Sequence, residues 1–315
     1  MTKANELATH VRGELAKVIV GQRESLDQLL LVLLVGGHAL LEGVPGLAKT
    51  LAVKVLAQIF QLKFQRVQCT PDLMPADVLG ANVFNMATST FNLHRGPVFT
   101  DLLLVDEINR TPPRTQSALL EAMEERQVTI DGTRHDLSKF FSVFSTQNPI
   151  EFEGTYPLPE AQLDRFLAKI CLSYPNAEQE MQILQNMQDG FDPRELQRVS
   201  FTTVAGETLF AARQEAAAVR VEPALFKYIV ALASRTRTWP AVSLGASPRA
   251  ATGLMLFAKA IAATEGRDFL IPDDIKQATL PILRHRLVLK PEADLEGVTA
   301  DQVVRDVVNS IEVPK

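Results

Sequence analysis

The sequence predicts an α/β protein: a doubly wound, parallel, five-stranded sheet followed by an all-helical domain. Short apolar segments alternate with amphipathic helical segments in the first half of the chain, as in parallel strands joined by helices. A Gly-rich turn follows the first of these apolar segments. After Pro175 strand patterns almost vanish. We therefore expect an α/β domain at 1–174 and a helical domain at 175–315.

The individual elements follow from apolar spacing and from turn residues. The five expected strands are 38–42, 63–69, 101–106, 140–146 and 167–172. The expected helices are 5–17, 23–35, 50–60, 111–126, 177–189, 207–218, 222–235, 248–264, 273–283 and 301–311. Two β-hairpins are expected at about 81–95 and at 127–137, where short apolar stretches flank polar or Asp-Gly turns.

Composition excludes several classes of protein. The net charge of −5 disfavours a protein that mainly holds nucleic acid, because phosphate contacts need a basic face. The longest apolar runs, 29–35 and 229–233, are too short to span a bilayer. The first residues lack the apolar core of a signal peptide. Cys69 and Cys171 are expected to be buried, reduced thiols. We expect a cytoplasmic protein with no membrane partner.

The turn after the first strand has the pattern of a phosphate-binding P-loop. This pattern requires Gly, four residues, and then Gly-Lys-Ser/Thr. Gly43, Lys49 and Thr50 fit, whereas Ala48 stands where a second glycine is expected. Because a Cβ at positive φ costs about 1 kcal/mol or more, we expect Ala48 to have negative φ. The whole loop is Gly43, Val44, Pro45, Gly46, Leu47, Ala48, Lys49 and Thr50.

Two carboxylates follow the expected strand 101–106. Asp106 and Glu107 come at its carboxyl end, the edge at which open α/β sheets bind ligands. In such a site Lys49 would reach the β- and γ-phosphates of a nucleotide, and Thr50 and Asp106 would hold Mg²⁺. Glu107 would polarise the attacking water, which favours hydrolysis over simple nucleotide binding.

Three further polar residues are weaker candidates on their own. Asn148 follows the expected strand 140–146 and could orient a water or touch the γ-phosphate, although Asn-Pro is also a plain turn. Arg165 precedes the last strand, and Arg249 opens a helix of the second domain. A single arginine is more often a solvated surface charge than a functional group.

Together these motifs resemble those of an AAA+ ATPase, and more closely the MoxR family, in the clade with an insert in the second helix. The resemblance covers roughly residues 5–290, and Ala before the P-loop lysine is usual in MoxR-like sequences. The residues that carry it are 43–50, Asp106-Glu107-Ile108-Asn109-Arg110, Thr146-Gln147-Asn148-Pro149 and the run 153–166.

The resemblance implies a role for each matched residue. Residues 43–50 form Walker A, Asp106 is the Walker B metal-site acid and Glu107 the catalytic base. Asn148 matches sensor 1, and Arg165 the arginine finger that reaches a neighbouring subunit's nucleotide. Arg249 matches sensor 2, held over the γ-phosphate by the helical lid. The segment against which adenine packs is matched by Val20, Gly21 and Gln22. Both hairpins would face a central pore.

The resemblance also implies an activity and partners. We expect an ATPase that uses ATP and Mg²⁺ in a ring of identical subunits, with a hexamer as the family expectation. Such a ring would remodel or mature client proteins, often inserting a metal or cofactor. Its partner would carry a von Willebrand factor A domain on a separate chain, because no such domain follows here. The alternatives are a slow nucleotide-dependent switch and, disfavoured by the acidic charge, a DNA-directed ATPase.

Overall fold

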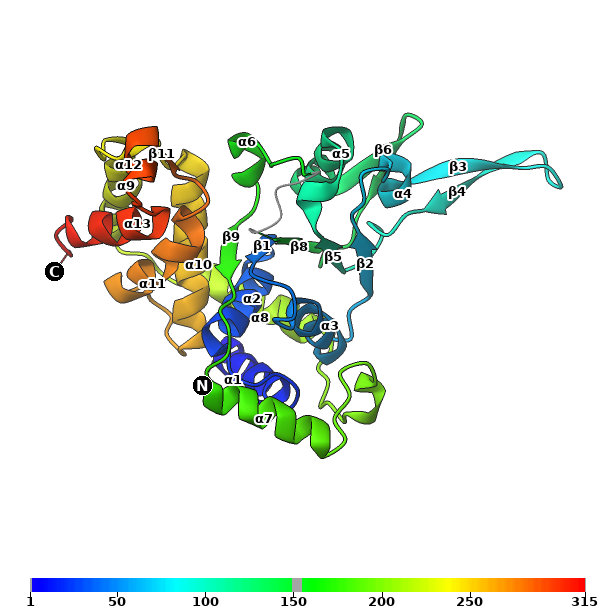
Figure 1. The fold of residues 1–315 in the computed structure, drawn as a ribbon, viewed down its shortest axis with the longest axis horizontal. Coiled ribbons are helices and arrows are strands. Elements are labelled where there is room, and N and C mark those ends of the chain that lie inside the picture. Colours follow the sequence, from blue (N-terminus) through cyan, green and yellow to red (C-terminus); the bar gives the residue numbers. More distant parts are fainter. Residues whose placement is uncertain (1, 149–154, 315) are drawn as a thin grey trace.

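The computed structural model describes residues 2–148 and 155–314. Its centre is a parallel sheet of five strands in the order β2-β5-β8-β1-β9 (Figure 1). The strands are β1 (Ala39–Glu42), β2 (Phe64–Gln68), β5 (Leu102–Asp106), β8 (Ser142–Gln147) and β9 (Ala168–Cys171). The predicted sheet is therefore confirmed, with strand ends shifted by at most two residues.

Helices cover both faces of this sheet, because its strands are apolar on both sides. Leu102 and Leu104 of β5 belong to a core shared with α1, α2 and α3. Leu103 and Val105 of the same strand belong to a second core, which includes α5 and β6. The elements that flank the strands are α1 (Lys3–Leu15), α2 (Arg23–Val35), α3 (Lys49–Ile59), α4 (Pro75–Leu79), α5 (Pro113–Glu125) and α6 (Glu160–Leu163).

Both expected hairpins are present. They are β3 (Gly80–Asn85) with β4 (Thr90–Arg95), and β6 (Gln127–Ile130) with β7 (Thr133–Asp136). The first projects from the molecule on the side away from the C-terminal helices (Figure 1). Gly80 and Gly96 close its base: a Cβ on either glycine would come within 2.3 Å of a carbonyl oxygen of the opposite segment. Near its tip the exposed rings of Phe84 and Phe91 pack 5.2 Å apart.

The C-terminal part is mainly helical. Its helices are α7 (Ala177–Gln188), α8 (Gly206–Ala218), α9 (Pro223–Arg237), α10 (Pro248–Thr264), α11 (Pro272–Leu283), α12 (Pro291–Leu295) and α13 (Ala300–Asn309). One detail departs from the all-helical expectation: β10 (Val242–Leu244) and β11 (Val288–Leu289) pair antiparallel. Strands of two and three residues are too short to produce a recognisable alternation.

Among the described residues, the helices are all too short or too polar to cross a membrane. Cys69 is buried, and burial raises the pKa of its thiol to about 11. The expectation that Cys171 is also buried is wrong, since this free cysteine at the end of β9 is exposed.

Candidate functional site

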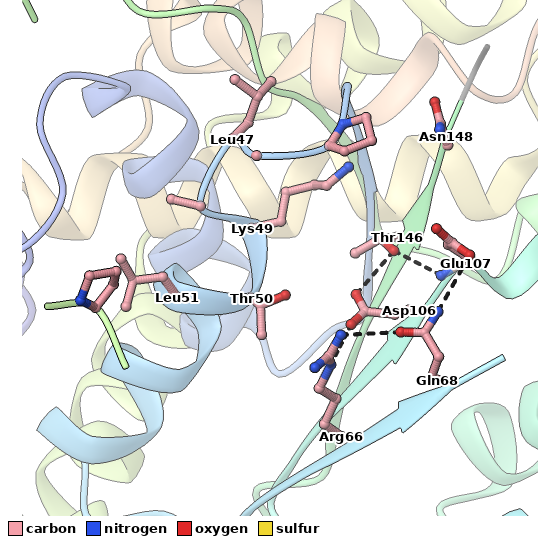
Figure 2. Close-up of a pocket in the computed structure, with 14 residues that line it drawn as sticks. Leu47, Lys49, Thr50, Leu51, Arg66, Gln68, Asp106, Glu107, Thr146 and Asn148 are labelled. Atoms are coloured by element: carbon pink, nitrogen blue, oxygen red, sulfur yellow. Dashed lines mark hydrogen bonds and ion pairs between the residues drawn. The ribbon is translucent and has the colours of Figure 1, made fainter. Parts of the chain in front are cut away.

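The carboxyl ends of three adjacent strands form the site. The chain leaves β1 into the P-loop, leaves β5 at Asp106 and leaves β8 at Asn148. Because β8 lies between β5 and β1, these three strand ends are neighbours at one edge of the sheet. A cavity of about 440 Å³ opens there (Figure 2). It is lined by Pro45, Gly46, Leu47, Ala48, Lys49, Thr50, Leu51, Arg66, Gln68, Asp106, Glu107, Thr146, Asn148 and Pro193.

The P-loop turns sharply into α3, and it does so through Ala48. The φ angle of Ala48 is 55°, in the left-handed region, and Gly46 has a φ of 87°. The prediction of a negative φ for Ala48 is therefore wrong. Helix α3 begins only at Lys49, so Ala48 is the cap that redirects the chain and not its first helical residue. The left-handed backbone conformation of Ala48 costs about 1–2 kcal/mol, and it persists because the turn from the loop into α3 requires it.

Lys49 supplies positive charge to the cavity. Its Nζ donates to the carbonyl oxygen of Gly43 within the loop. Burial lowers the pKa of Lys49, and the nearby carboxylates of Asp106, Glu107 and Glu42 oppose this shift. The N-terminus of α3 adds the partial positive charge of its dipole. Lysine and helix end together favour a polyanion in this cavity.

Asp106 and Glu107 are held by a neighbouring strand. The hydroxyl of Thr146 on β8 donates to Asp106 at 3.2 Å and accepts from the backbone N–H of Glu107 at 2.9 Å. Asp106 is buried, and the hydroxyl of Thr50 faces it across the cavity (Figure 2). Glu107 has a φ of 57°, an unusual backbone state for a non-glycine residue. Its carboxylate lies 2.9 Å from Arg110.

The donor set fits Mg²⁺ bound together with phosphates. Thr50 and Asp106 offer the hydroxyl and carboxylate oxygens that hard cations prefer. Among residues 2–148 and 155–314, three or more His, Cys, Asp or Glu side chains gather nowhere as a self-sufficient metal site. Mg²⁺ usually takes only one or two protein carboxylates and completes its shell with water and phosphate oxygens. A single aspartate beside Thr50 therefore suits it.

A second, more apolar cavity of about 200 Å³ adjoins the first and shares five residues with it. Val20 and Gln22 line this second cavity opposite Ile183 and Met187 of α7. Gly21, which the resemblance placed in the same segment, lines the next cavity, between α1 and α2. An apolar cavity beside a phosphate cavity suits the base of a nucleotide.

The two candidate arginines lie elsewhere. Arg165, just after α6, places its Nε 3.1 Å from the carboxylate of Glu124 on α5. Arg249, in the first turn of α10, donates to the other oxygen of the same carboxylate. Neither arginine lines the P-loop cavity of its own chain. The structure thus brings Arg165 and Arg249 together, but separately from Lys49, Thr50, Asp106, Glu107 and Asn148.

Comparison with known proteins agrees with this architecture. Residues 38–168 match the ATPase family associated with various cellular activities (AAA), and residues 234–307 match the AAA lid domain. The chain is 42% identical to chaperone MoxR1 of Mycobacterium tuberculosis, over 96% of this chain and 81% of that protein. It is 29% identical to protein MoxR of Methylorubrum extorquens, over 99% of this chain and 95% of that one. The chain belongs to the MoxR family of AAA ATPases.

Two further proteins are similar to this chain over nearly its whole length. YeaC of Bacillus subtilis is 44% identical over 95% of this chain and 92% of its own length. The crystal structure of a candidate ATPase from Cytophaga hutchinsonii superposes with a TM-score of 0.90 at 40% identity. That superposition covers 99% of this chain and 96% of the other, so the α/β core and the lid are both shared.

Sequence reasoning missed three polar residues that contact the predicted functional residues. Arg66 on β2 donates from Nε to Asp106 at 2.6 Å, and Gln68 on the same strand lies 3.4 Å from Glu107. Glu124 is the third, as the carboxylate that the two arginines share. Arg66 and Gln68 alternate on one face of a strand, but nothing in the sequence indicates that β2 is the neighbour of β5. Only the sheet order brings them to the cavity.

Proposed function

We propose that this MoxR chain hydrolyses ATP, with Mg²⁺, at a site completed by Arg165 and Arg249 of a neighbouring copy. One observation carries the proposal. The cavity collects a phosphate-binding lysine, a metal-site pair and a candidate base, whereas the two arginines lie together outside it. Charge that develops on a γ-phosphate needs such cations. A second subunit can supply them if the subunits form a closed ring, and a hexamer is the ring size that we propose.

The residues of the cavity have complementary tasks in this reaction. Lys49 and the N–H groups at the start of α3 bind the phosphates. Thr50 and Asp106 would hold Mg²⁺, which would supply positive charge to offset the negative charge of the phosphates. Glu107 accepts the proton of the attacking water at its carboxylate, and Asn148 orients that water. Val20 and Gln22 hold the base in the apolar cavity, with Gly21 behind them.

The test is the ATPase rate per subunit as protein concentration rises. We expect the rate to increase with assembly, and Arg165→Ala to abolish that increase while fluorescent ATP still binds. Mixing Arg165→Ala with Glu107→Gln chains should restore part of the rate, because each variant supplies what the other lacks. A rate independent of concentration, or unaffected by Arg165→Ala, would contradict the composite site.

We further propose that hydrolysis remodels a client protein. The name of MoxR1, a chaperone, supports this at 42% identity. The β3–β4 hairpin offers exposed Phe84 and Phe91 on a base closed by two glycines, which suits contact with an apolar client segment. A separate protein with a von Willebrand factor A domain is the partner that the family resemblance implies. Purification of the Glu107→Gln variant from the native cell, with identification of the bound proteins, tests both.

A slow nucleotide-dependent switch is the competing function, and one contact favours it. Glu107 lies 2.9 Å from Arg110, and a carboxylate held in an ion pair is less available to an attacking water. The two functions differ in turnover. With ATP bound, the Glu107→Gln variant of a switch would still bind its partner. The same variant of a remodelling ATPase would no longer remodel its client protein. Added DNA should leave the rate unchanged, and stimulation by DNA would instead favour a DNA-directed ATPase.

A further inference from the structure

Asp164 connects the segment that carries Arg165 to the lid helix that carries Arg249. Its carboxylate accepts from the Ser247 hydroxyl at 3.0 and 2.9 Å and from Nε of Arg286 at 2.7 Å. Ser247 is also the N-cap of α10, where its hydroxyl accepts from the N–H of Ala250. Arg249 therefore stands two residues beyond one partner of Asp164, and Arg165 is adjacent to Asp164 itself.

Arg286 makes this connection hard to break. Its side chain is 3% exposed, and each of its five N–H donors has a partner. Besides Asp164, the guanidinium donates to the carbonyl oxygens of Asp164, Phe166, Leu167 and Ile282. His285 adds a contact to the carbonyl of Phe166 at 3.1 Å. Separation of 164–167 from the lid would leave a buried guanidinium and several carbonyl groups without partners, which is strongly unfavourable.

We propose that Asp164, held by Arg286 and Ser247, is a positioning residue that makes Arg165 and Arg249 one rigid pair. This inference rests on the proposed function, in which the pair serves the nucleotide of a neighbouring copy. The lid of each subunit then moves with its own Arg165 segment. A loose connection would misplace both guanidinium groups, and small displacements of a charge-stabilising group cost large factors in rate.

The test uses mixed assemblies in which only one kind of site can work. Donor chains carry Glu107→Gln, so their own site is inactive but their arginines are intact. Acceptor chains carry Arg165→Ala and Arg249→Ala, so they hold ATP but offer no arginine. ATPase activity of the mixture then reports the donor's arginines acting on the acceptor's ATP. Inactivity of this parental mixture would refute the composite site itself, and the positioning proposal with it.

Asp164→Asn is then placed in one partner at a time. In the donor we expect the maximal rate to fall about tenfold or more, with little change in KM for ATP. In the acceptor we expect less than about a twofold change, because its arginines are already absent. A purely structural role would lower the rate equally from either side. An equal loss from both sides, or no loss from either, overturns the proposal.

A milder pair of variants keeps the test decisive if Asp164→Asn does not fold. Ser247→Ala removes the hydroxyl that donates to Asp164 and also the N-cap of α10. Thr299→Ala removes a matching N-cap from α13, a helix that carries neither Arg165 nor Arg249, where Thr299 accepts from Gln302. In donor chains we expect Ser247→Ala to lower the rate of the mixture and Thr299→Ala to leave it unchanged. Equal effects of the two would refute the positioning role.

Discussion

Arg165 and Arg249, which belong to different parts of the fold, bind the same carboxylate, that of Glu124. Two guanidinium groups repel one another, and the carboxylate between them offsets that repulsion. The contact of Arg165 uses Nε, and within residues 2–148 and 155–314 its two terminal amino groups are left as donors for a phosphate. Glu124 therefore fixes the direction in which the pair faces.

Replacement of this carboxylate should weaken hydrolysis and leave nucleotide binding intact. We expect Glu124→Gln to lower the ATPase rate of the assembled protein about tenfold, the worth of a hydrogen bond to a charged group. Nucleotide affinity should not change, because Glu124 lines neither of the two cavities that we propose to hold ATP. Glu121→Gln, at an exposed position of the same helix, is the control. A rate equal to or above that of the unmodified protein would contradict a positioning role for Glu124.

The two carboxylates at the end of β5 should fail in different ways. Glu107→Gln should lower turnover about 100-fold or more and preserve ATP affinity, because the amide cannot accept the proton of water. Asp106→Asn should instead remove the part of the affinity that depends on Mg²⁺. Titration of a fluorescent ATP analogue with and without Mg²⁺, beside steady-state turnover, separates the two. Equal loss of Mg²⁺-dependent affinity in both variants would contradict the assignment.

The left-handed backbone of Ala48 predicts an unusual response to glycine. Ala48→Gly relieves about 1–2 kcal/mol of backbone strain and costs about 0.4–1 kcal/mol in unfolded-state entropy. We expect unchanged or slightly higher stability in urea unfolding. Ala52→Gly, inside α3 and buried, should instead destabilise by about 1 kcal/mol or more. Similar destabilisation by both would mean that Ala48 is not strained.

Stability should fall as the pH is lowered, in part because of His38. This buried side chain donates to the carbonyl of Met123 and accepts from the N–H of Val143, and burial lowers its pKa from 6.5 to about 4. Below pH 6.5 the unfolded chain therefore binds a proton that the folded chain rejects. The stability contributed by neutral His38 is complete above pH 6.5 and decreases as the pH falls towards 4.

A variant isolates this contribution. His38→Gln should be less stable at pH 8, yet between pH 8 and 5.5 it should lose about 1.4 kcal/mol less than the unmodified protein. Urea unfolding at several pH values measures the difference. Buried His285, whose pKa is lowered in the same direction, gives both proteins a common background slope. Parallel stability curves for the two proteins would show that His38 does not titrate in this way.

The parts of the site that the sequence predicts are those fixed by neighbours in the chain. An apolar strand that ends in Asp106-Glu107 must place both residues at the carboxyl edge, and Lys49-Thr50 must open the helix after the loop. Their convergence needs only a parallel sheet, which the apolar strands already indicate. Asn148 reaches the same cavity for the same reason.

The parts that the sequence does not predict depend on which elements become neighbours. Glu124 lies on α5, and nothing near it in the chain indicates that α6 and the lid will bring two arginines to it. The contact of Arg66 with Asp106 requires β2 to pair with β5, and hydrophobic periodicity does not reveal the order of strands in a sheet. The backbone of Ala48 was mispredicted because local preference favoured negative φ, whereas the turn into α3 demands a left-handed residue.

The pairing of β1 with β9 would give the proposed ring of subunits a direction. Strand β1 enters the loop that binds a subunit's own phosphates, and it hydrogen-bonds along its length to β9, which begins just after Arg165. Lys169 of β9 also pairs with Glu42 of β1 at 2.7 Å. In the proposed ring, a shift in one subunit's loop would reach, through a single pair of strands, the arginine that it offers to the next subunit. Release of phosphate at one site would then shift the arginine offered to the following site. Hydrolysis would therefore proceed from subunit to subunit around the ring in one rotational sense.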